Sequence, residues 1–232
     1  MNERTTWLKN RNKLTSYEYS NDWETVISLF KQRIENKFFK PIEVLLRHGN
    51  SDGTGFTIVS VQCLLIELFA AFRTGEIHNS RYNENVDPSY QYKDCVNIYT
   101  EFLQTVDCFK NHFFTINENG TKFLDIPFKA VDFYSDVRCG LLHEGKTKKK
   151  WTINLKPKNE SNDLFIKNTG GKIKIYRTLL HRHLKKYMDE YLLDLRGTTD
   201  NSKNLRRNFA RKMDNLYGFK PNKNKFEWWI DK

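Results

Sequence analysis

The sequence predicts an all-α fold: a helical bundle with a small β-hairpin insertion and a basic C-terminal extension. Apolar residues recur at three- and four-residue steps through most of the chain, which is the spacing of amphipathic helices. Only five prolines and eleven glycines interrupt 232 residues, too few for a many-turned β-sandwich. The aromatic content of 14% supplies enough apolar surface for a sizeable core.

The elements follow in order along the chain. Residues 1–21 are polar and weakly patterned, and we interpret them as a loose N-terminal arm. Four helices are then predicted, at residues 23–38, 57–74 and 92–114 and in the stretch between Pro127 and Gly145. Pro41 should limit the first of them. The second is apolar around most of its circumference, so it should be central to the fold.

The pattern changes after residue 150. Three short strand-like runs lie within residues 151–175, and Gly170-Gly171 separates the last two, which predicts a small antiparallel sheet or hairpin. A fifth helix should cover residues 176–195. The basic, aromatic stretch 197–232 either packs on the core or serves as a partner-binding arm. We therefore divide the chain into an arm (1–21), a helical domain (22–196) and an extension (197–232).

The charge and cysteine content narrow the function. The formal charge is +11 and the pI about 9.4, which indicates a polyanionic partner, most often nucleic acid, although high charge also serves solubility alone. The four cysteines lack metal-ligand spacing. The N-terminus lacks the apolar core of a signal peptide, and no apolar run approaches the length of a membrane span. These features predict a reduced cytoplasmic protein that needs no metal or cofactor and binds no membrane.

The most informative motif places Arg138 five residues before His143. An arginine can hold a phosphate through two hydrogen bonds, and a histidine can transfer a proton near neutral pH. Together they could cut RNA without a metal, by attack of the 2′-hydroxyl on the adjacent phosphate. The same spacing recurs at Arg73 and His78, but Gly75 breaks that helix, and we assign the second match to chance.

The run Arg138-Cys139-Gly140-Leu141-Leu142-His143-Glu144-Gly145, with an aromatic amphipathic helix before it and a Trp-led strand after it, resembles the HEPN family. The resemblance covers about residues 22–195. It implies a dimeric, metal-independent endoribonuclease of phage-defence or toxin systems, in which Arg138 and His143 are catalytic. Its implied partners are RNA (tRNA among the candidates), a second copy, and an antitoxin or defence-system protein.

Two positions depart from the family pattern. Cys139 stands where HEPN proteins often carry Asn, Asp or His, and a thiol is a poorer hydrogen-bond former than an amide. Gly145 stands where toxins controlled by a nucleotidyltransferase antitoxin tend to carry a tyrosine, which counts against that form of control.

The spacing of the motif sets a geometric problem. Residues five apart on an ideal helix lie about 140° apart around the axis, so Arg138 and His143 do not share a face. Either the helix distorts near Gly140, or a second copy completes the site across a two-fold axis. In our interpretation the supporting residues are Glu67, Cys139 and Glu144.

Each motif residue also has a purely structural interpretation. Arg138 could pair with Glu67 or Asp136 and only hold the bundle together. His143 could interact with the carbonyls at the end of its helix. The runner-up function is therefore a non-catalytic HEPN-like module that binds RNA or protein.

A lysine cluster follows the motif directly: Lys146, Lys148, Lys149 and Lys150. These lysines either hold the phosphates of an RNA strand or form a solvated loop. His181 and His183 lie among basic residues, and we interpret them as part of a solvated basic face.

Overall fold

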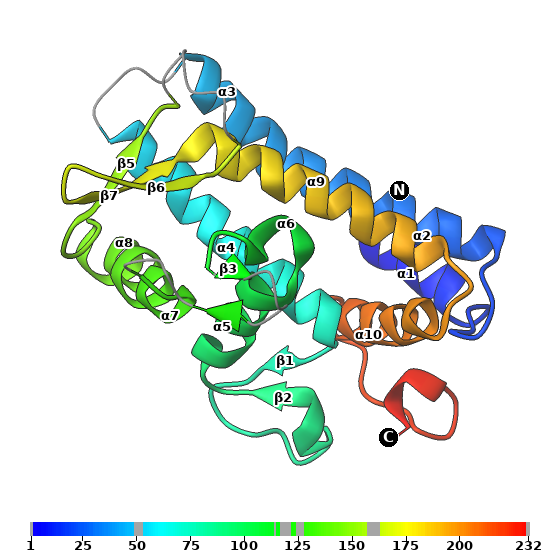
Figure 1. The fold of residues 1–232 in the computed structure, drawn as a ribbon. Coiled ribbons are helices and arrows are strands. Elements are labelled where there is room, and N and C mark those ends of the chain that lie inside the picture. Colours follow the sequence, from blue (N-terminus) through cyan, green and yellow to red (C-terminus); the bar gives the residue numbers. More distant parts are fainter. Residues whose placement is uncertain are drawn as a thin grey trace. The chain divides into compact units, whose positions relative to one another are not determined.

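The computed structural model describes residues 2–48, 53–113, 115–116, 122–123, 128–156 and 163–230. The described chain is mostly helical with small sheets, so the all-α prediction is confirmed at that level (Figure 1). Pro127, at the start of one predicted helix, lies outside the described residues. The chain forms two compact units: the first unit is Met1–Asn36, Leu68–Cys95 and Met188–Lys232, and the second unit is Lys37–Glu67 and Val96–Tyr187.

The helices alternate with short turns of π- and 3-10-helix. Those of the N-terminal half are α1 (Glu3–Arg11), α2 (Asn21–Ile34), η1 (Glu35–Phe39), α3 (Lys40–His48), α4 (Thr54–Thr74), η2 (Pro88–Tyr90) and α5 (Cys95–Thr105). Those that follow are α6 (Asp107–Lys110), α7 (Ala130–Asp132), η3 (Phe133–Arg138), α8 (Cys139–Glu144), α9 (Arg177–Arg196), α10 (Asp200–Leu216) and η4 (Glu227–Trp229). The predicted helix at 92–114 is thus two helices, α5 and α6, separated at Val106.

The first unit has an aromatic core between α2, the end of α4 and α10. Phe30 of α2 lies 4.6 Å from the ring of Phe72 and 5.3 Å from that of Phe209, measured between ring centroids. The prediction of a loose N-terminal arm is wrong for α1, because this helix packs against α2 and buries Trp7 completely. An isolated polar helix of nine residues is marginal in water, so packing has to stabilise it.

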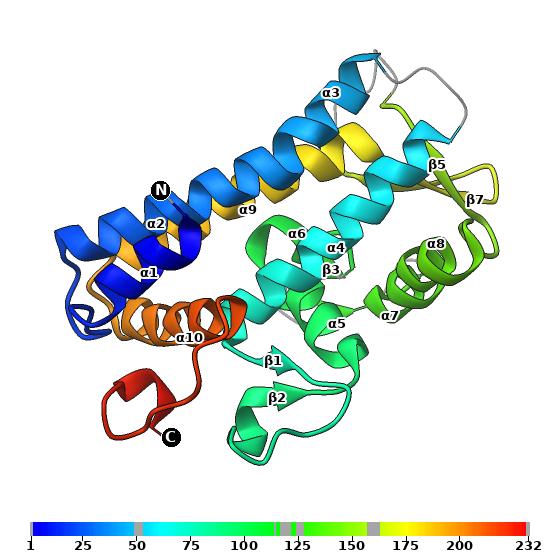
Figure 2. The same ribbon diagram turned by 180° about the vertical axis from the view of Figure 1, so that it is seen from behind.

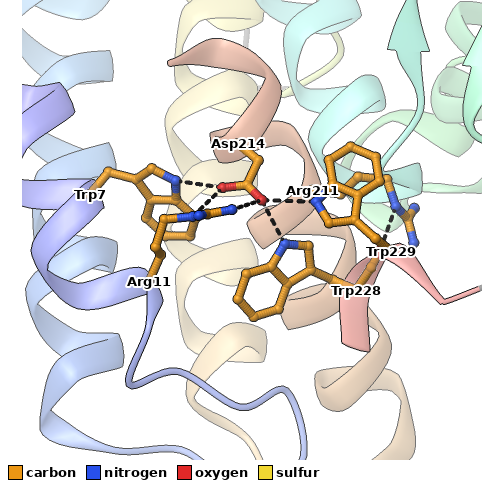
Figure 3. Close-up of polar contacts among 6 residues, drawn as sticks. All are labelled: Trp7, Arg11, Arg211, Asp214, Trp228 and Trp229. Atoms are coloured by element: carbon orange, nitrogen blue, oxygen red, sulfur yellow. Dashed lines mark hydrogen bonds and ion pairs between the residues drawn. The ribbon is translucent and has the colours of Figure 1, made fainter. Parts of the chain in front are cut away.

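A buried carboxylate joins both ends of the chain within the first unit (Figure 3). Arg11 donates from Nε and Nη2 to the two oxygens of Asp214, at 2.7 and 2.6 Å. The indole nitrogens of Trp7, Trp228 and Trp229 each donate to the same carboxylate at 2.9 Å. The C-terminal extension therefore packs into the fold, the first of the two alternatives that its composition left open.

A π-turn carries the helical path past Pro41. The sequence predicts a helix end here, but η1 joins α2 to α3, and Pro41 is the second residue of α3. A proline ring clashes with the carbonyl four residues earlier in a regular helix, and that residue, Lys37, lies in the wider π-turn. The extra residue of the turn also shifts the register, so that Phe39 is fully buried in place of the predicted Phe38.

Helix α4 is long and apolar enough to span a membrane, with 21 residues and a mean hydropathy of 1.9 in its most apolar window. The expectation that no apolar run approaches a membrane span is therefore wrong by length and composition. More than half of that window, 56%, is buried inside the protein, as in the core helix of a soluble protein. The sequence-based expectation that this helix is central agrees with that burial.

The strands form small sheets (Figure 2). They are β1 (Ile77–His78), β2 (Gln91–Tyr92), β3 (Thr115–Ile116), β4 (Lys122–Phe123), β5 (Trp151–Asn154), β6 (Ile166–Thr169) and β7 (Lys172–Tyr176). In the three-stranded sheet of the second unit, β6 and β7 form the predicted hairpin, with Gly170 and Gly171 both at positive φ. Strand β5 pairs with the other edge of β7 in parallel, so the sheet is mixed and not wholly antiparallel as predicted.

Candidate functional site

The Arg138–His143 motif lies in one continuous helical segment of the second unit, formed by α7, η3 and α8. The π-turn η3 ends at Arg138, and regular α-helix runs from Cys139 to Glu144. Gly145, at a φ of 63°, ends the segment as predicted. The helical distortion thus includes Arg138 and ends two residues before Gly140. Because the path between Arg138 and His143 is regular, the two residues lie on different faces of the helix.

Arg138 is held by an acid on another helix. Its Nη2 donates to Oε2 of Glu67 on α4 at 2.9 Å, and its guanidinium lies 5.4 Å from the ring centroid of Tyr134. Nη1 of Arg138 lies 4.0 Å from Sγ of Cys139, so the thiol is the group beside this nitrogen. Burial lowers the pKa of Arg138, but the hydrogen bond and charge of Glu67 outweigh this and raise the pKa above its ordinary value. The guanidinium therefore stays charged at every working pH.

The layer beneath the ion pair is neutral. Cys63 and Tyr99 are both buried, and burial raises the pKa of the Cys63 thiol to about 12. Burial, with the neighbouring Cys63, also raises the pKa of Tyr99 well above its ordinary value. Cys63 is the small buried hydrophobe that its apolar run predicts. Charge at this place is thus carried by Arg138 and Glu67, whose side chains keep 18% and 21% of their surface exposed.

His143 lies on another side of the same helix. It is exposed and forms no hydrogen bond or ion pair with any residue that the structure describes. The interpretation in which it caps the helix carbonyls therefore has no contact to support it in the described chain. His143, Gly140 and Asp136 follow each other at three- and four-residue steps, so they share one face. Arg138, two residues from Asp136 and from Gly140, lies on the opposite face.

The lysine cluster folds back along the His143 face. The amide of Lys146 donates to the carbonyl of Gly140 at 3.3 Å, and the amide of Lys148 donates to the carbonyl of Asp136 at 2.8 Å. A Cβ atom on Gly140 would lie 2.6 Å from the carbonyl oxygen of Lys146, so this close approach requires glycine. The sequence placed these lysines beside the motif, but only the structure shows which face they follow.

The acids around the motif separate into different pairs. Asp136, which the sequence offered as a partner for Arg138, instead lies 3.1 Å from Nζ of Lys149. Glu144 lies 3.9 Å from Nζ of Lys148, a distance at which two half-exposed groups interact weakly. Of the predicted supporting residues, Glu67 and Cys139 contact Arg138, whereas Glu144 contacts the lysine loop.

The interpretation of His181 and His183 as a solvated basic face is wrong. Both are buried, at 6% and 9% exposure, because they lie on the packed side of α9. His181 Nε2 lies 3.4 Å from Glu43, and His183 Nε2 donates to the carbonyl of Asp163 at 2.8 Å. Their spacing from the apolar positions of the same helix, such as Leu184, carried a signal of burial that the neighbouring charges obscured.

Sequence reasoning did not single out His112, which is the histidine of the second unit with the largest change in pKa. Its Nδ1 donates to the carbonyl of Phe109 at 3.0 Å, and its Nε2 accepts from the amide of Phe165 at 3.1 Å. Burial, with the neighbouring His183, lowers the pKa of His112 to about 3. Both ring nitrogens are used by the backbone, so His112 is a structural residue.

The second Arg-x4-His match does not form a comparable element. Helix α4 ends at Thr74, and His78 lies in β1 with its ring 5.3 Å from that of Tyr92. Within the described ranges, no three His, Cys, Asp or Glu side chains converge as a metal site would require. No family model, curated protein or solved structure matches this chain.

Proposed function

We propose that this chain is a metal-independent, HEPN-type endoribonuclease of the cytoplasm, acting in phage defence or as a toxin. One observation carries the proposal. A permanently charged arginine, fixed by Glu67, precedes by five residues an exposed histidine that makes no polar contact with the described chain. A histidine with a purely structural role would be expected to have a partner.

The chemistry requires one phosphate contact and two proton transfers. The 2′-hydroxyl of the RNA attacks the adjacent phosphorus, the bond from phosphorus to the 5′-oxygen breaks, and the products are a 2′,3′-cyclic phosphate and a 5′-hydroxyl. His143 takes the proton of the attacking hydroxyl or delivers one to the leaving oxygen. Arg138 binds the non-bridging oxygens as negative charge develops on them. The net charge of +11 attracts the phosphates of the RNA.

A second copy of the chain completes the site in this proposal. Arg138 and His143 lie on different faces of one helix, so a single chain presents them to different directions. Leu142, one turn after Arg138, is 62% exposed, and Leu64, one turn before Glu67, is 52% exposed. In this proposal the two leucines belong to the surface that the second copy covers. A two-fold dimer would bring Arg138 of one chain toward His143 of the other.

The second candidate is a binding module without catalysis. It is favoured by the pairing of Arg138 with Glu67, which occupies part of the guanidinium, and by the thiol of Cys139 in place of a better hydrogen-bond former. In this reading the charged surface holds RNA or an acidic partner, and no bond is cut.

Cleavage assays separate the two functions. Wild type, His143→Ala and the matched control His78→Ala are incubated with total RNA and tRNA in EDTA, and the ends of the fragments are mapped. If the protein is a ribonuclease, we expect fragments with cyclic-phosphate ends from wild type and from His78→Ala, and no fragments from His143→Ala. Equal cutting by wild type and both variants would exclude His143 as a catalytic residue. Binding without any cutting would favour the module.

Mixing two inactive variants tests the composite site. If Arg138 of one chain acts with His143 of the other, Arg138→Ala and His143→Ala together regain up to about a quarter of wild-type activity, since half of the dimers are mixed and hold one intact pair. If both residues act within one chain, mixing restores nothing. The mass of each mixture in solution checks that dimers form.

A further inference from the structure

Asp136 is a buried carboxylate that faces the lysine loop. Its side chain is 6% exposed and lies 3.1 Å from Nζ of Lys149, whose own side chain is 69% exposed. The carbonyl of Asp136 also accepts the amide of Lys148 at 2.8 Å. A buried carboxylate without a partner is costly, so this pair holds the loop to the helix through both backbone and side chain.

The loop is fixed at several further points. Lys149 has a φ of 51°, a left-handed conformation that non-glycine residues keep only where their surroundings hold them. Thr147 donates from Oγ1 to the carbonyl of Trp151 at 2.7 Å, and the carbonyl of Lys150 accepts the amide of Ile173 in β7 at 2.9 Å. The segment from Lys146 to Lys150, which we call the platform, is therefore hydrogen-bonded to both the motif helix and the sheet.

The lysines of this platform are not equivalent. The amine of Lys149 pairs with Asp136 at 3.1 Å, and that of Lys148 lies 3.9 Å from Glu144. Lys146 and Lys150 are exposed and form no ion pair with any residue in the described ranges. The loop that carries these two lysines follows the face of the helix on which His143 lies.

We propose that Asp136 is a positioning residue for RNA: it uses Lys149 to fix the loop, so that Lys146 and Lys150 bind the phosphates of the strand that passes His143. This inference rests on the proposed function, because it names the surface through which that site takes its RNA. It divides four neighbouring lysines of equal charge into one structural residue, one weakly paired residue and two phosphate ligands.

The salt dependence of binding tests this division. Lys146→Met, Lys149→Met and Lys150→Met each remove one charge and keep the length of the side chain, so they are matched controls for one another. Binding of a single-stranded 2′-O-methyl RNA, which lacks the attacking hydroxyl, is measured by fluorescence anisotropy over a range of salt concentrations. We expect Lys146→Met and Lys150→Met each to reduce the steepness of the log–log salt dependence by about 0.7. Lys149→Met should keep the full slope but weaken binding at every salt concentration, because both phosphate ligands remain and only the loop that positions them is less fixed.

A second measurement reports the positioning directly. We expect the amides of residues 146 and 148 to exchange with solvent faster in both Asp136→Asn and Lys149→Met than in wild type. Adding Lys149→Met to Asp136→Asn should produce no further change, because both substitutions break the same contact. With cleavable RNA, Lys149→Met should raise KM and leave kcat unaltered, since His143 and Arg138 are untouched.

The outcomes distinguish this inference from the proposed function. A loss of salt dependence in Lys149→Met equal to that in its neighbours, or additive exchange effects in the double variant, would overturn the role of Asp136. If wild type cuts RNA and the lysines behave in that way, only this inference fails. If wild type neither binds nor cuts RNA, the phosphate assignment and the proposed function fail together.

Discussion

Each unit of the molecule contains an arginine–carboxylate pair, and the two pairs are built for different ends. In the first unit, the side chains of Arg11 and Asp214 are 9% and 0% exposed, and Asp214 accepts five hydrogen bonds in all from Arg11 and three tryptophans (Figure 3). In the second unit, Arg138 and Glu67 keep 18% and 21% exposure, and Arg138 reaches Glu67 through Nη2 with Nη1 turned to a thiol.

The difference shows how one kind of ion pair serves two purposes. A carboxylate saturated by donors and shielded from water has no capacity left for a ligand, so its contribution is to stability. An arginine held at one side and solvated at the other is oriented and still available to a phosphate. The first pair organises the fold, and the second is the better candidate for chemistry.

The largest effect should come from Asp214→Asn. The substitution leaves the buried Arg11 without its counter-charge, and loss of one partner of a buried pair typically costs about 3–5 kcal/mol. Urea unfolding measures the loss of free energy of unfolding. The control is Asp200→Asn on the same helix, whose carboxylate is 93% exposed and should change nothing measurable. If both substitutions lowered the free energy of unfolding equally, the buried carboxylate of Asp214 would not have the stabilising role that we assign to it.

Gly140→Ala should be the next most harmful, by about 2–3 kcal/mol, because the new methyl group would meet the carbonyl of Lys146 at 2.6 Å. A backbone atom cannot turn away as a side chain can, so the lysine loop has to move. Gly145→Ala is the comparison: nothing lies within 4 Å of its added Cβ, and only its positive φ carries a cost, of about 1 kcal/mol. If unfolding in urea shows Gly145→Ala to be the worse of the two, the tight packing of the loop is not important.

Lowering the pH from 7.5 to 5.0 should destabilise the second unit more than the first. The folded pKa of His112 is about 3, below its ordinary value of 6.5, so between these values the unfolded chain binds more protons and stability falls as the pH falls. From pH 7.5 to 5.0 the second unit should lose about 2 kcal/mol through His112. In the first unit, the pKa of Glu24 is lowered to about 2 by its hydrogen bond from Arg196, so its contribution is lost only below its ordinary value of 4.5.

Unfolding at the two pH values checks this, with His112→Gln and His143→Gln as a matched pair. Glutamine can keep both backbone contacts of His112 without titrating, so His112→Gln should remove the larger part of the pH dependence. The remainder should come from His181, whose pKa burial also lowers. His143→Gln, at an exposed position, should retain the full pH dependence. A pH dependence that survives undiminished in His112→Gln would place its origin in another group.

Glu67→Gln should have the smallest effect on stability. It is the most direct test of whether the Arg138–Glu67 pair, unlike the Arg11–Asp214 pair, serves chemistry. Because both partners are partly solvated, we expect a loss of only about 1 kcal/mol in the free energy of unfolding. RNA cleavage should fall at least about tenfold, because Arg138 would lose the group that orients it. A variant with full cleavage activity would show that Arg138 needs no positioning by Glu67.

Local pattern was sufficient for much of the fold. The apolar spacing in α2 and α9 identified their buried faces, and Gly145 marked the end of the motif helix at the correct residue. In α4, which is apolar around most of its circumference, it did not, since Leu64 is 52% exposed. Trp23, Phe30 and Leu184 are buried because apolar residues repeated at helical spacing lie on one face, which packing removes from water.

Neither the helix register after a π-turn nor the pairing of strands distant in the chain could be predicted from the sequence. The π-turn η1 inserts a residue into the helix, so that Phe39 is buried where regular helical spacing would bury Phe38. A π-turn is stabilised by its tertiary surroundings and leaves no strong local signal. For the same reason, the parallel pairing of β5 with β7 could not be read from either strand alone.

The sequence by itself determined the helical class, the excess of positive charge and the proximity of an arginine, a histidine and a lysine cluster along the chain. Only the tertiary structure decided which acid meets each base: Glu67 holds Arg138, Asp136 holds Lys149, and Asp214 joins the two ends of the chain. The physical reason is range. Helical periodicity depends on neighbours three and four residues apart, whereas the partner of a buried charge is the group that folding brings beside it.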